Sequence, residues 1–192
     1  MKFKARVDSL QDSMTKILAA KRGTDEEGKP KVSPETRGLE MGVDEIFRIL
    51  AKYQTVDTDD PETSDEFDIS GMSPHQVEED KVRLVAFSTN VMISAAKARA
   101  AAKYFIAKGK EFGAKKVATE KSAIEAEGGK FVATTAKYTY DAIKGEYEAR
   151  AAENEAEAEA LAAIADRADS MVQVLKKVHE RMVREMMMMP GA

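Results

Sequence analysis

The chain has 192 residues, a formal net charge of −4 and no cysteine, which excludes a disulfide framework, a thiol nucleophile and any cysteine-based metal site. Its length suits one domain with an appendage, and its 33% charged and 6% aromatic residues favour extended helices over a dense globular core. No apolar run approaches the roughly 20 residues that cross a bilayer, and the N-terminus lacks the apolar region of a signal peptide. We therefore expect a soluble, cytoplasmic protein with no membrane partner.

Residues 1–54 are predicted to form short N-terminal helices. In the first, apolar side chains from Val7 to Leu18 recur every three or four residues, and the glycines and prolines of residues 23–34 end the pattern. The second is expected over Val43 to Tyr53, with acidic residues in its first turn. These helices could pair as a small appendage or bind a partner.

Charge divides the rest of the chain. Residues 40–80 carry thirteen acidic side chains against two basic ones, whereas residues 81–150 carry fourteen basic against seven acidic ones. Within the acidic block, residues 55–74 combine proline, glycine and clustered acids with few large apolar side chains. Such a segment buries too little surface to offset its ordering entropy, so we predict an acidic linker there.

A long helix followed by a basic segment is predicted over residues 75–129. Ser73 and Pro74 supply an N-cap and a proline at the first helical position. The helix is expected to end near Gly109 or Gly113, and a short helical piece to continue to the Gly128-Gly129 pair.

Residues 130–192 are predicted to form a long C-terminal oligomerisation helix with a Met-rich tail. Apolar residues recur every seven positions over more than three heptads, with Asn154 on the same seam, a spacing typical of coiled coils. Because this helix is longer than its predicted partner could cover, self-association is expected to bury the seam. The candidate interface residues are Tyr140, Ile143, Tyr147, Leu161, Ile164, Leu175 and Met182. The predicted fold class is therefore all-α, a long helical hairpin with a coiled-coil-like C-terminal helix in an oligomeric assembly.

Catalytic chemistry has no positive support in the sequence. His75 and His179 are the only histidines and lie far apart along the chain, and no HExxH motif or Gly-rich phosphate loop is present. Alternating glutamates between residues 153 and 159 fan around a helix axis, so they do not converge on a metal ion. We expect no enzyme activity, no cofactor and no metal.

The stretch from Lys97 to Lys121 gathers eight lysines and arginines against two glutamates, with Tyr104, Phe105 and Phe112 interleaved. Cations for phosphates and flat rings for bases are what single-stranded nucleic-acid binding requires. The alternative is that the rings belong to the core and the lysines are solvated or pair with the acidic block. The candidate nucleic-acid-binding residues are Lys97, Arg99, Lys103, Tyr104, Lys108, Lys110, Lys115, Lys116 and Lys121.

Three short motifs stand out: "NVM" at Asn90 to Met92, "KKVA" at Lys115 to Ala118, and the Lys97-Ala98-Arg99 triplet near Tyr104-Phe105. Through these motifs, roughly residues 82–182 resemble the UvsY-type recombination mediators of T4-like phages. In that family the Lys-Ala-Arg and aromatic element follows the KKVA element, whereas here it precedes it, so only residues 115–118 carry over position by position. The N-terminal seventy-odd residues have no counterpart in the resemblance.

The resemblance implies a homo-oligomer in the cytoplasm of a phage-infected host that binds single-stranded DNA. It further implies partners of two kinds, a RecA-like recombinase and the single-strand binding protein that the recombinase replaces. We expect the acidic segment of residues 57–68 either to compete with DNA for the basic stretch or to recruit a basic partner. The rival interpretation is a non-enzymatic virion structural, scaffold or assembly protein, whose basic stretch would bind an acidic block of a neighbouring subunit.

Overall fold

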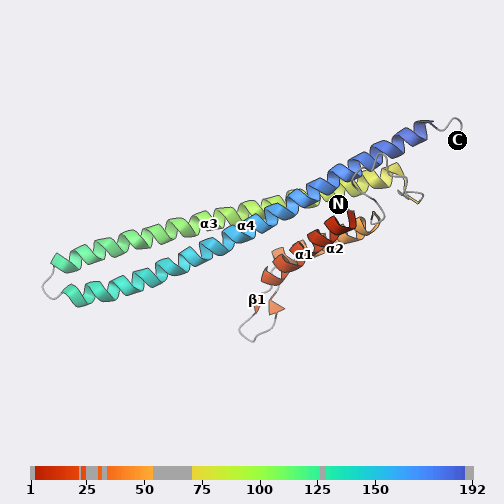
Figure 1. Ribbon diagram of the computed structural model, residues 1–192. Helices are drawn as coiled ribbons and strands as arrows, with labels where there is room; N and C mark the ends of the chain where they lie inside the picture. Colours follow the sequence, from red (N-terminus) through yellow and green to blue (C-terminus); the bar gives the residue numbers. More distant parts are fainter. Residues whose placement is uncertain are drawn as a thin grey trace. The chain divides into compact units, whose positions relative to one another are not determined.

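The computed structural model describes residues 3–21, 23–24, 30–31, 34–53, 71–125 and 129–188. Within these ranges the chain forms four α-helices and one pair of two-residue strands, so the predicted all-α class is confirmed (Figure 1). The elements in chain order are α1 (Phe3–Lys21), β1 (Gly23–Thr24), β2 (Pro30–Lys31), α2 (Pro34–Ala51), α3 (Pro74–Glu125) and α4 (Gly129–Met188).

The two predicted N-terminal helices are present as α1 and α2. The strands between them pair antiparallel, with Gly23 opposite Lys31 and Thr24 opposite Pro30. The helix α2 begins at Pro34, nine residues earlier than the predicted Val43. Proline suits a first helical position because its fixed φ is helical and its missing N–H needs no partner there. Pro34, the last residue of the predicted break after the first helix, is therefore the first residue of α2.

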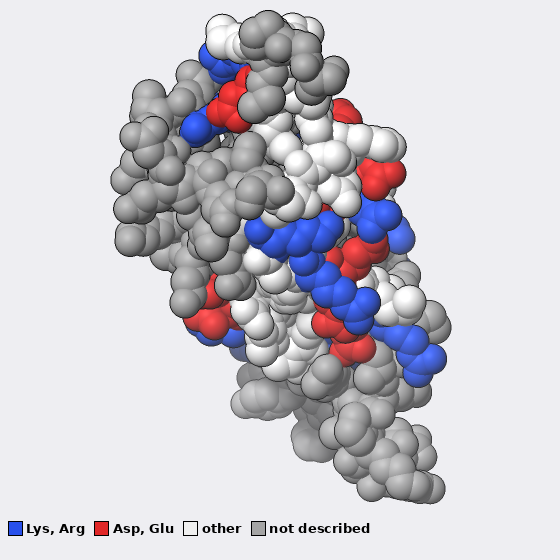
Figure 2. All heavy atoms as spheres, turned by 90° about the vertical axis from the view of Figure 1, so that its right-hand side faces the viewer, with Lys and Arg blue, Asp and Glu red and all other residues white. Residues whose placement is uncertain are grey.

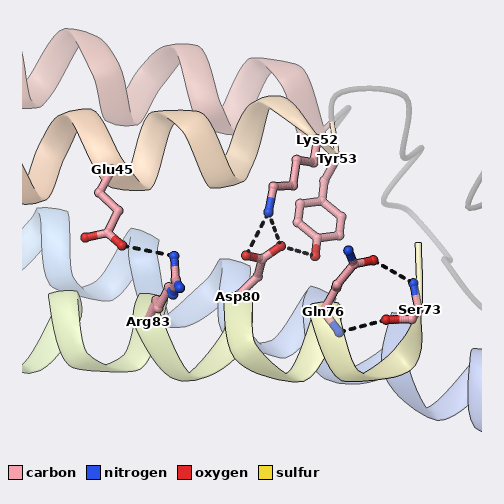
Figure 3. Close-up of polar contacts among 7 residues, drawn as sticks. All are labelled: Glu45, Lys52, Tyr53, Ser73, Gln76, Asp80 and Arg83. Carbon is pink, nitrogen blue, oxygen red and sulfur yellow. Dashed lines mark hydrogen bonds and ion pairs between the residues drawn. The ribbon is translucent and has the colours of Figure 1, made fainter. Parts of the chain in front are cut away.

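The start of α3 agrees with the sequence. The backbone N–H of Gln76 donates to Oγ of Ser73 at 3.2 Å, and the N–H of Ser73 donates to Oε1 of Gln76 at 2.9 Å (Figure 3). This reciprocal pair is a capping box, which satisfies two backbone donors that would otherwise lack partners. It fixes the point at which the chain enters the long helix.

The predicted break of α3 at Gly109 or Gly113 is wrong, because the helix continues unbroken to Glu125. A glycine inside a helix costs about 1 kcal/mol relative to alanine, which neighbouring packing can offset. At Gly109 the space beside the backbone is occupied by α4, where Cβ of Tyr147 and the carbonyl oxygen of Lys144 lie 3.7 and 3.9 Å from the position of an added Cβ. With 52 residues, α3 is nearly as long as the 60-residue α4.

The described chain separates into two compact units, and each of the two long helices contributes one segment to each unit. Unit 1 comprises Met1–Ile93 and Ala160–Ala192, and unit 2 comprises Ser94–Glu159. Most of the predicted acidic linker, residues 55–70, lies outside the described residues.

Unit 1 holds most of the buried apolar side chains. One stripe of α1, one of α2, the first part of α3 and the last part of α4 all contribute. The largest fully buried side chains in this unit are Leu10, Met14, Leu50, Tyr53, Val77, Leu84, Val91, Leu161, Ile164, Met171 and Leu175. Ser88 donates to the carbonyl of Ala165 at 3.4 Å and His179 lies 3.8 Å from Glu78, so the two segments of α3 and α4 in this unit run antiparallel.

Polar contacts hold α2 against α3 within unit 1. The carboxylate of Asp80, which is 5% exposed, accepts hydrogen bonds from Nζ of Lys52 at 3.0 Å and from the hydroxyl of Tyr53 at 2.8 Å (Figure 3). Two turns closer to the middle of α2, Glu45 pairs with Arg83 at 3.2 Å. The buried carboxylate therefore has a cation and a hydroxyl as partners, which is what a buried charge requires.

Candidate nucleic-acid interface

Unit 2 consists of one segment of α3 and one of α4 that run antiparallel. Alanines dominate the contact, and Ala98, Ala102, Ala151 and Ala158 are buried. Alanine has the highest helix propensity, so these residues favour the helical state of both segments and allow them to approach closely.

Four of the predicted site residues are exposed cations on α3: Lys97, Arg99, Lys103 and Lys110. None of them makes an ion pair with another residue in the described part of the chain. From Ser94 to Lys110 the sequence contains no acidic residue. Arg99, Lys103 and Lys110 are separated by four and seven residues, which places them on one side of the helix, whereas Lys97 lies on the opposite flank.

Two further predicted site residues are tied to a single glutamate. Oε2 of Glu111 lies 2.9 Å from Nζ of Lys108, and Oε1 lies 2.8 Å from Nζ of Lys115. The hydrogen bonds from these lysines lower the pKa of Glu111 to about 2, and the bond to Glu111 raises the pKa of Lys108. Glu111 therefore stays ionised at neutral pH and neutralises part of the basic stretch.

Lys116 is also engaged within unit 2. Its Nζ donates to both carboxylate oxygens of Asp141 on α4, at 2.7 and 3.0 Å. This hydrogen bond lowers the pKa of Asp141. Lys116 thus links α3 to α4, whereas the side chain of the last predicted site residue, Lys121, lies outside the described residues.

The predicted grouping of three aromatic rings with the cations is only partly present. The ring of Phe112 stacks on Tyr147 with centroids 5.5 Å apart and lies 6.4 Å from Tyr140, and Phe105 lies 6.1 Å from Tyr147. Phe105 and Phe112 therefore pack against α4, as the alternative interpretation of the sequence expected. Tyr104 is different, because 56% of it is exposed while its ring meets the edge of Phe105 at 5.5 Å.

The seven predicted oligomer-interface residues lie on the side of α4 that meets other parts of the same chain. Leu161, Ile164, Leu175 and Met182 are buried in unit 1, and Tyr140, Ile143 and Tyr147 are half-buried in unit 2. Their burial therefore does not require a second copy. Self-association through this seam stays a prediction.

Glu111 was not singled out from the sequence, although it decides how much of the positive charge is available. The spacing of Glu111 from the neighbouring lysines could have predicted these ion pairs. A glutamate three residues after one lysine and four before another is placed to pair with both on a helix.

Basic and acidic side chains are mixed elsewhere on the described surface. Figure 2 shows lysines and arginines lying beside aspartates and glutamates where charged side chains occur on the described part of this face. The pairs Lys81–Glu78 and Arg181–Glu185, both in unit 1, are examples. The acid-free stretch of α3 in unit 2 is thus unlike these neutralised surfaces.

Within the described ranges, no group of three or more histidine, aspartate or glutamate side chains is arranged to hold a metal ion. The described helices also include none that is long and apolar enough to cross a membrane.

Comparison with known proteins gives no relative: no protein family, no curated protein and no solved structure matches the chain.

Proposed function

We propose that the protein is a non-enzymatic single-stranded nucleic-acid-binding protein that holds the phosphate backbone on the α3 segment of unit 2. The observation that carries the proposal is that Arg99, Lys103 and Lys110 are exposed on one side of an acid-free stretch of helix, with no ion-pair partner in the described part of the chain; Lys97 adds a cation on the opposite flank. Arg99 and Lys110 are about 16 Å apart along the helix axis, a length over which a nucleic-acid strand presents several phosphates.

The exposed ring of Tyr104 supports a single strand over a duplex. Base–aromatic stacking requires an unpaired base with an open face. Tyr104 lies one residue after Lys103, and Nζ of Lys108 is 6.0 Å from its ring centroid, so a stacked base would have a cation close by. Lys103, Lys108 and the ring of Tyr104 therefore lie within two turns of α3.

The more specific role that we propose is that of a recombination mediator. The support for it is the resemblance of residues 82–182 to the UvsY-type mediators, together with the long helices and the basic segment. In this role an oligomer would bind single-stranded DNA through repeated basic stretches and help a RecA-like recombinase to replace the single-strand binding protein. Multivalency would strengthen the individually weak phosphate contacts.

A structural or assembly protein is the second candidate, and exposed apolar side chains favour it. Val82, Val85, Met92 and Ile93 are exposed on α3, and Met186 to Met188 are exposed at the end of α4. Such side chains suit protein–protein contacts rather than contacts with nucleic acid.

The two candidates are separated by measuring binding of a labelled single-stranded oligonucleotide by fluorescence anisotropy over a salt series. The proposed function predicts that the logarithm of the affinity falls linearly with the logarithm of the salt concentration, with a slope of about −0.7 for each phosphate contacted. It also predicts weaker binding to a duplex of the same sequence. Absence of binding at low salt would contradict the proposal and favour the assembly protein.

A further inference from the structure

Arg150 on α4 is an exposed cation of unit 2 that lies against α3. Its Cζ atom is 6.0 Å from the ring centroid of Phe105. Glu146 and Glu153 lie four residues before it and three after it, separations at which side chains of one helix can form ion pairs. Arg150 nevertheless forms no ion pair in the described part of the chain. Its guanidinium is therefore held by a ring of α3, and its charge is not neutralised.

Phe105 lies on the side of α3 that also carries Tyr104. Gly109 marks the direction of α4, because the nearest atom of α4 is 3.7 Å from a Cβ added to this glycine. At about 100° per residue, Phe105 and Tyr104 lie about 40° and about 140° from Gly109 in one direction around the helix. Lys103 lies about 120° away in the other direction. Arg150, which contacts Phe105, is therefore on the Tyr104 side of the helical pair.

This side of unit 2 combines an open ring with available positive charge. Tyr104 is 56% exposed. Lys97 precedes it by seven residues, about two helical turns, so both side chains lie on the same flank. Lys97 is exposed and, like Arg150, has no ion-pair partner among the described residues, whereas Lys108 beside the Tyr104 ring is paired with Glu111. The name Tyr104 flank is used below for Lys97, Tyr104, Phe105 and Arg150.

We propose that the Tyr104 flank binds one unpaired nucleotide of a nucleic-acid strand, with the base stacked on Tyr104 and the adjoining phosphate bound by Arg150. This inference rests on the proposed function and adds to it a residue of α4. Bases stack on exposed aromatic rings, and a guanidinium presents parallel N–H donors that match two oxygens of a phosphate. The contact with Phe105 pairs none of these donors with an oxygen, so they remain available to the phosphate.

The two flanks of α3 in unit 2 then hold different parts of the strand. Arg99, Lys103 and Lys110 lie on a flank whose contacts are to phosphates only, and phosphates are present whether or not the bases are paired. The Tyr104 flank requires a base with a free face, which a duplex does not offer. The preference for a single strand is therefore assigned to the Tyr104 flank.

The base contact is tested with two labelled strands of equal length, an oligothymidylate and a strand of abasic deoxyribose phosphates. Both are titrated with the full-length chain and followed by fluorescence anisotropy. Tyr104→Leu is expected to lower the affinity for oligothymidylate by about fivefold or more, the effect of losing one stacked base, and to leave the affinity for the abasic strand unchanged. Tyr104→Phe retains the ring and should bind both strands as the native chain does. An equal loss for both strands, or a loss for neither, would overturn the assignment of a base to Tyr104.

The phosphate contact is tested by Arg150→Gln. We expect the affinity for both strands to fall about tenfold, the effect of losing hydrogen bonds to a charged group. The slope of log affinity against log salt should decrease in magnitude by about 0.7, the value for one phosphate of a single strand. Arg37→Gln is the matched control, because Arg37 is an exposed arginine on α2 in unit 1, and it should change neither quantity. A lower affinity with an unchanged slope would show that Arg150 only supports Phe105, and the proposal would fail.

A second variant of Arg150 guards against loss of structure. Circular dichroism reports whether each variant retains the native helix content. Arg150→Lys keeps the charge and lacks the parallel donors, so it should bind more weakly than the native chain with the native salt slope. Native affinity of Arg150→Lys would contradict the role of the guanidinium.

The same titrations separate this inference from the proposed function. If the native chain binds oligothymidylate and neither Tyr104→Leu nor Arg150→Gln weakens that binding, the inference is wrong and the proposed function stands on the other flank alone. If the native chain binds neither strand at low salt, both are wrong.

Discussion

The hydroxyl of Tyr53 donates a 2.8 Å hydrogen bond to Oδ2 of Asp80, and both residues are buried. Tyr53 follows the end of α2 and Asp80 lies in the second turn of α3, 27 residues later. Between these two residues the chain passes through a long segment outside the described residues. The bond therefore joins two parts of unit 1 that are not adjacent along the chain, and it stabilises the position of α2 against α3.

Removal of this hydroxyl is expected to destabilise the fold. Tyr53→Phe leaves the ring in place but takes one partner from a buried carboxylate, which costs about 1.5–3 kcal/mol for a hydrogen bond to a charged group. The free energy of unfolding in urea, followed by circular dichroism, measures the effect. Tyr104→Phe is the control, because Tyr104 is exposed and its change should stay within about 0.5 kcal/mol. Equal effects of the two changes would contradict the role assigned to Tyr53.

The same bond predicts a loss of stability in alkaline solution. Burial, followed by the hydrogen bond to Asp80 and its negative charge, raises the pKa of Tyr53 above its ordinary value of 10.0. The unfolded chain therefore releases this proton first as the pH rises. The contribution of Tyr53 to stability is complete below pH 10 and declines above it. Urea unfolding of the native chain and of Tyr53→Phe at pH 8 and pH 11 should show a smaller loss in the variant, and an equal loss would contradict the prediction.

Much of the fold could be predicted from local sequence signals. The apolar repeat of α1, the cap at Ser73 and the long C-terminal helix depend on residues close together in the chain, and all three are present. The direction of the exposed Tyr104 and the packing of Phe105 and Phe112 depend on α4, which lies far along the sequence. Spacing alone placed these three rings together on the surface with the cations, whereas in the structure Phe105 and Phe112 pack against Tyr147 and Tyr104 stays exposed beside Lys108.

The wrongly predicted break in α3 and the unpredicted burial of Asp80 also depend on contacts with residues far away in the sequence. Gly109 and Gly113 have low helix propensity, and the sequence gives no sign that α4 packs beside them. The buried Asp80 likewise belongs, by composition, to an acidic block that is otherwise polar. Only the position of Lys52 and Tyr53 shows why this carboxylate is tolerated in the core.

Continuity of α3 through its glycines can be tested by substitution. At Gly113 the nearest atom to an added Cβ is Cδ of Lys144 at 4.0 Å, so alanine fits without a clash. Gly113→Ala should therefore raise the free energy of unfolding by up to about 1 kcal/mol, since alanine favours a helix more than glycine. A loss of stability in thermal or urea unfolding would indicate that the chain needs glycine flexibility at this point.

Glu111 is expected to weaken nucleic-acid binding in the native chain. Glu111→Gln removes a negative charge beside Lys108 and Lys115, and we expect the affinity for single-stranded DNA to rise about fivefold, because one unit charge close to a phosphate repels it only weakly in water. Glu180→Gln, which removes an exposed charge of unit 1, should change the affinity little. Anisotropy at low salt compares the three proteins. A fall in affinity for Glu111→Gln would contradict the assignment of this surface.

We expect the exposed cations of α3 in unit 2 to bind phosphates, and paired lysine substitutions test this binding. The measurement is the salt dependence of single-stranded DNA binding for Lys103→Ala combined with Lys110→Ala, compared with Lys176→Ala combined with Lys177→Ala, two exposed lysines of α4 in unit 1. We predict that the first pair reduces the slope of log affinity against log salt by about 1.4, or about 0.7 for each phosphate that the variant no longer binds, and that the second pair leaves the slope unchanged. Equal slopes for both double variants and the native chain would contradict it.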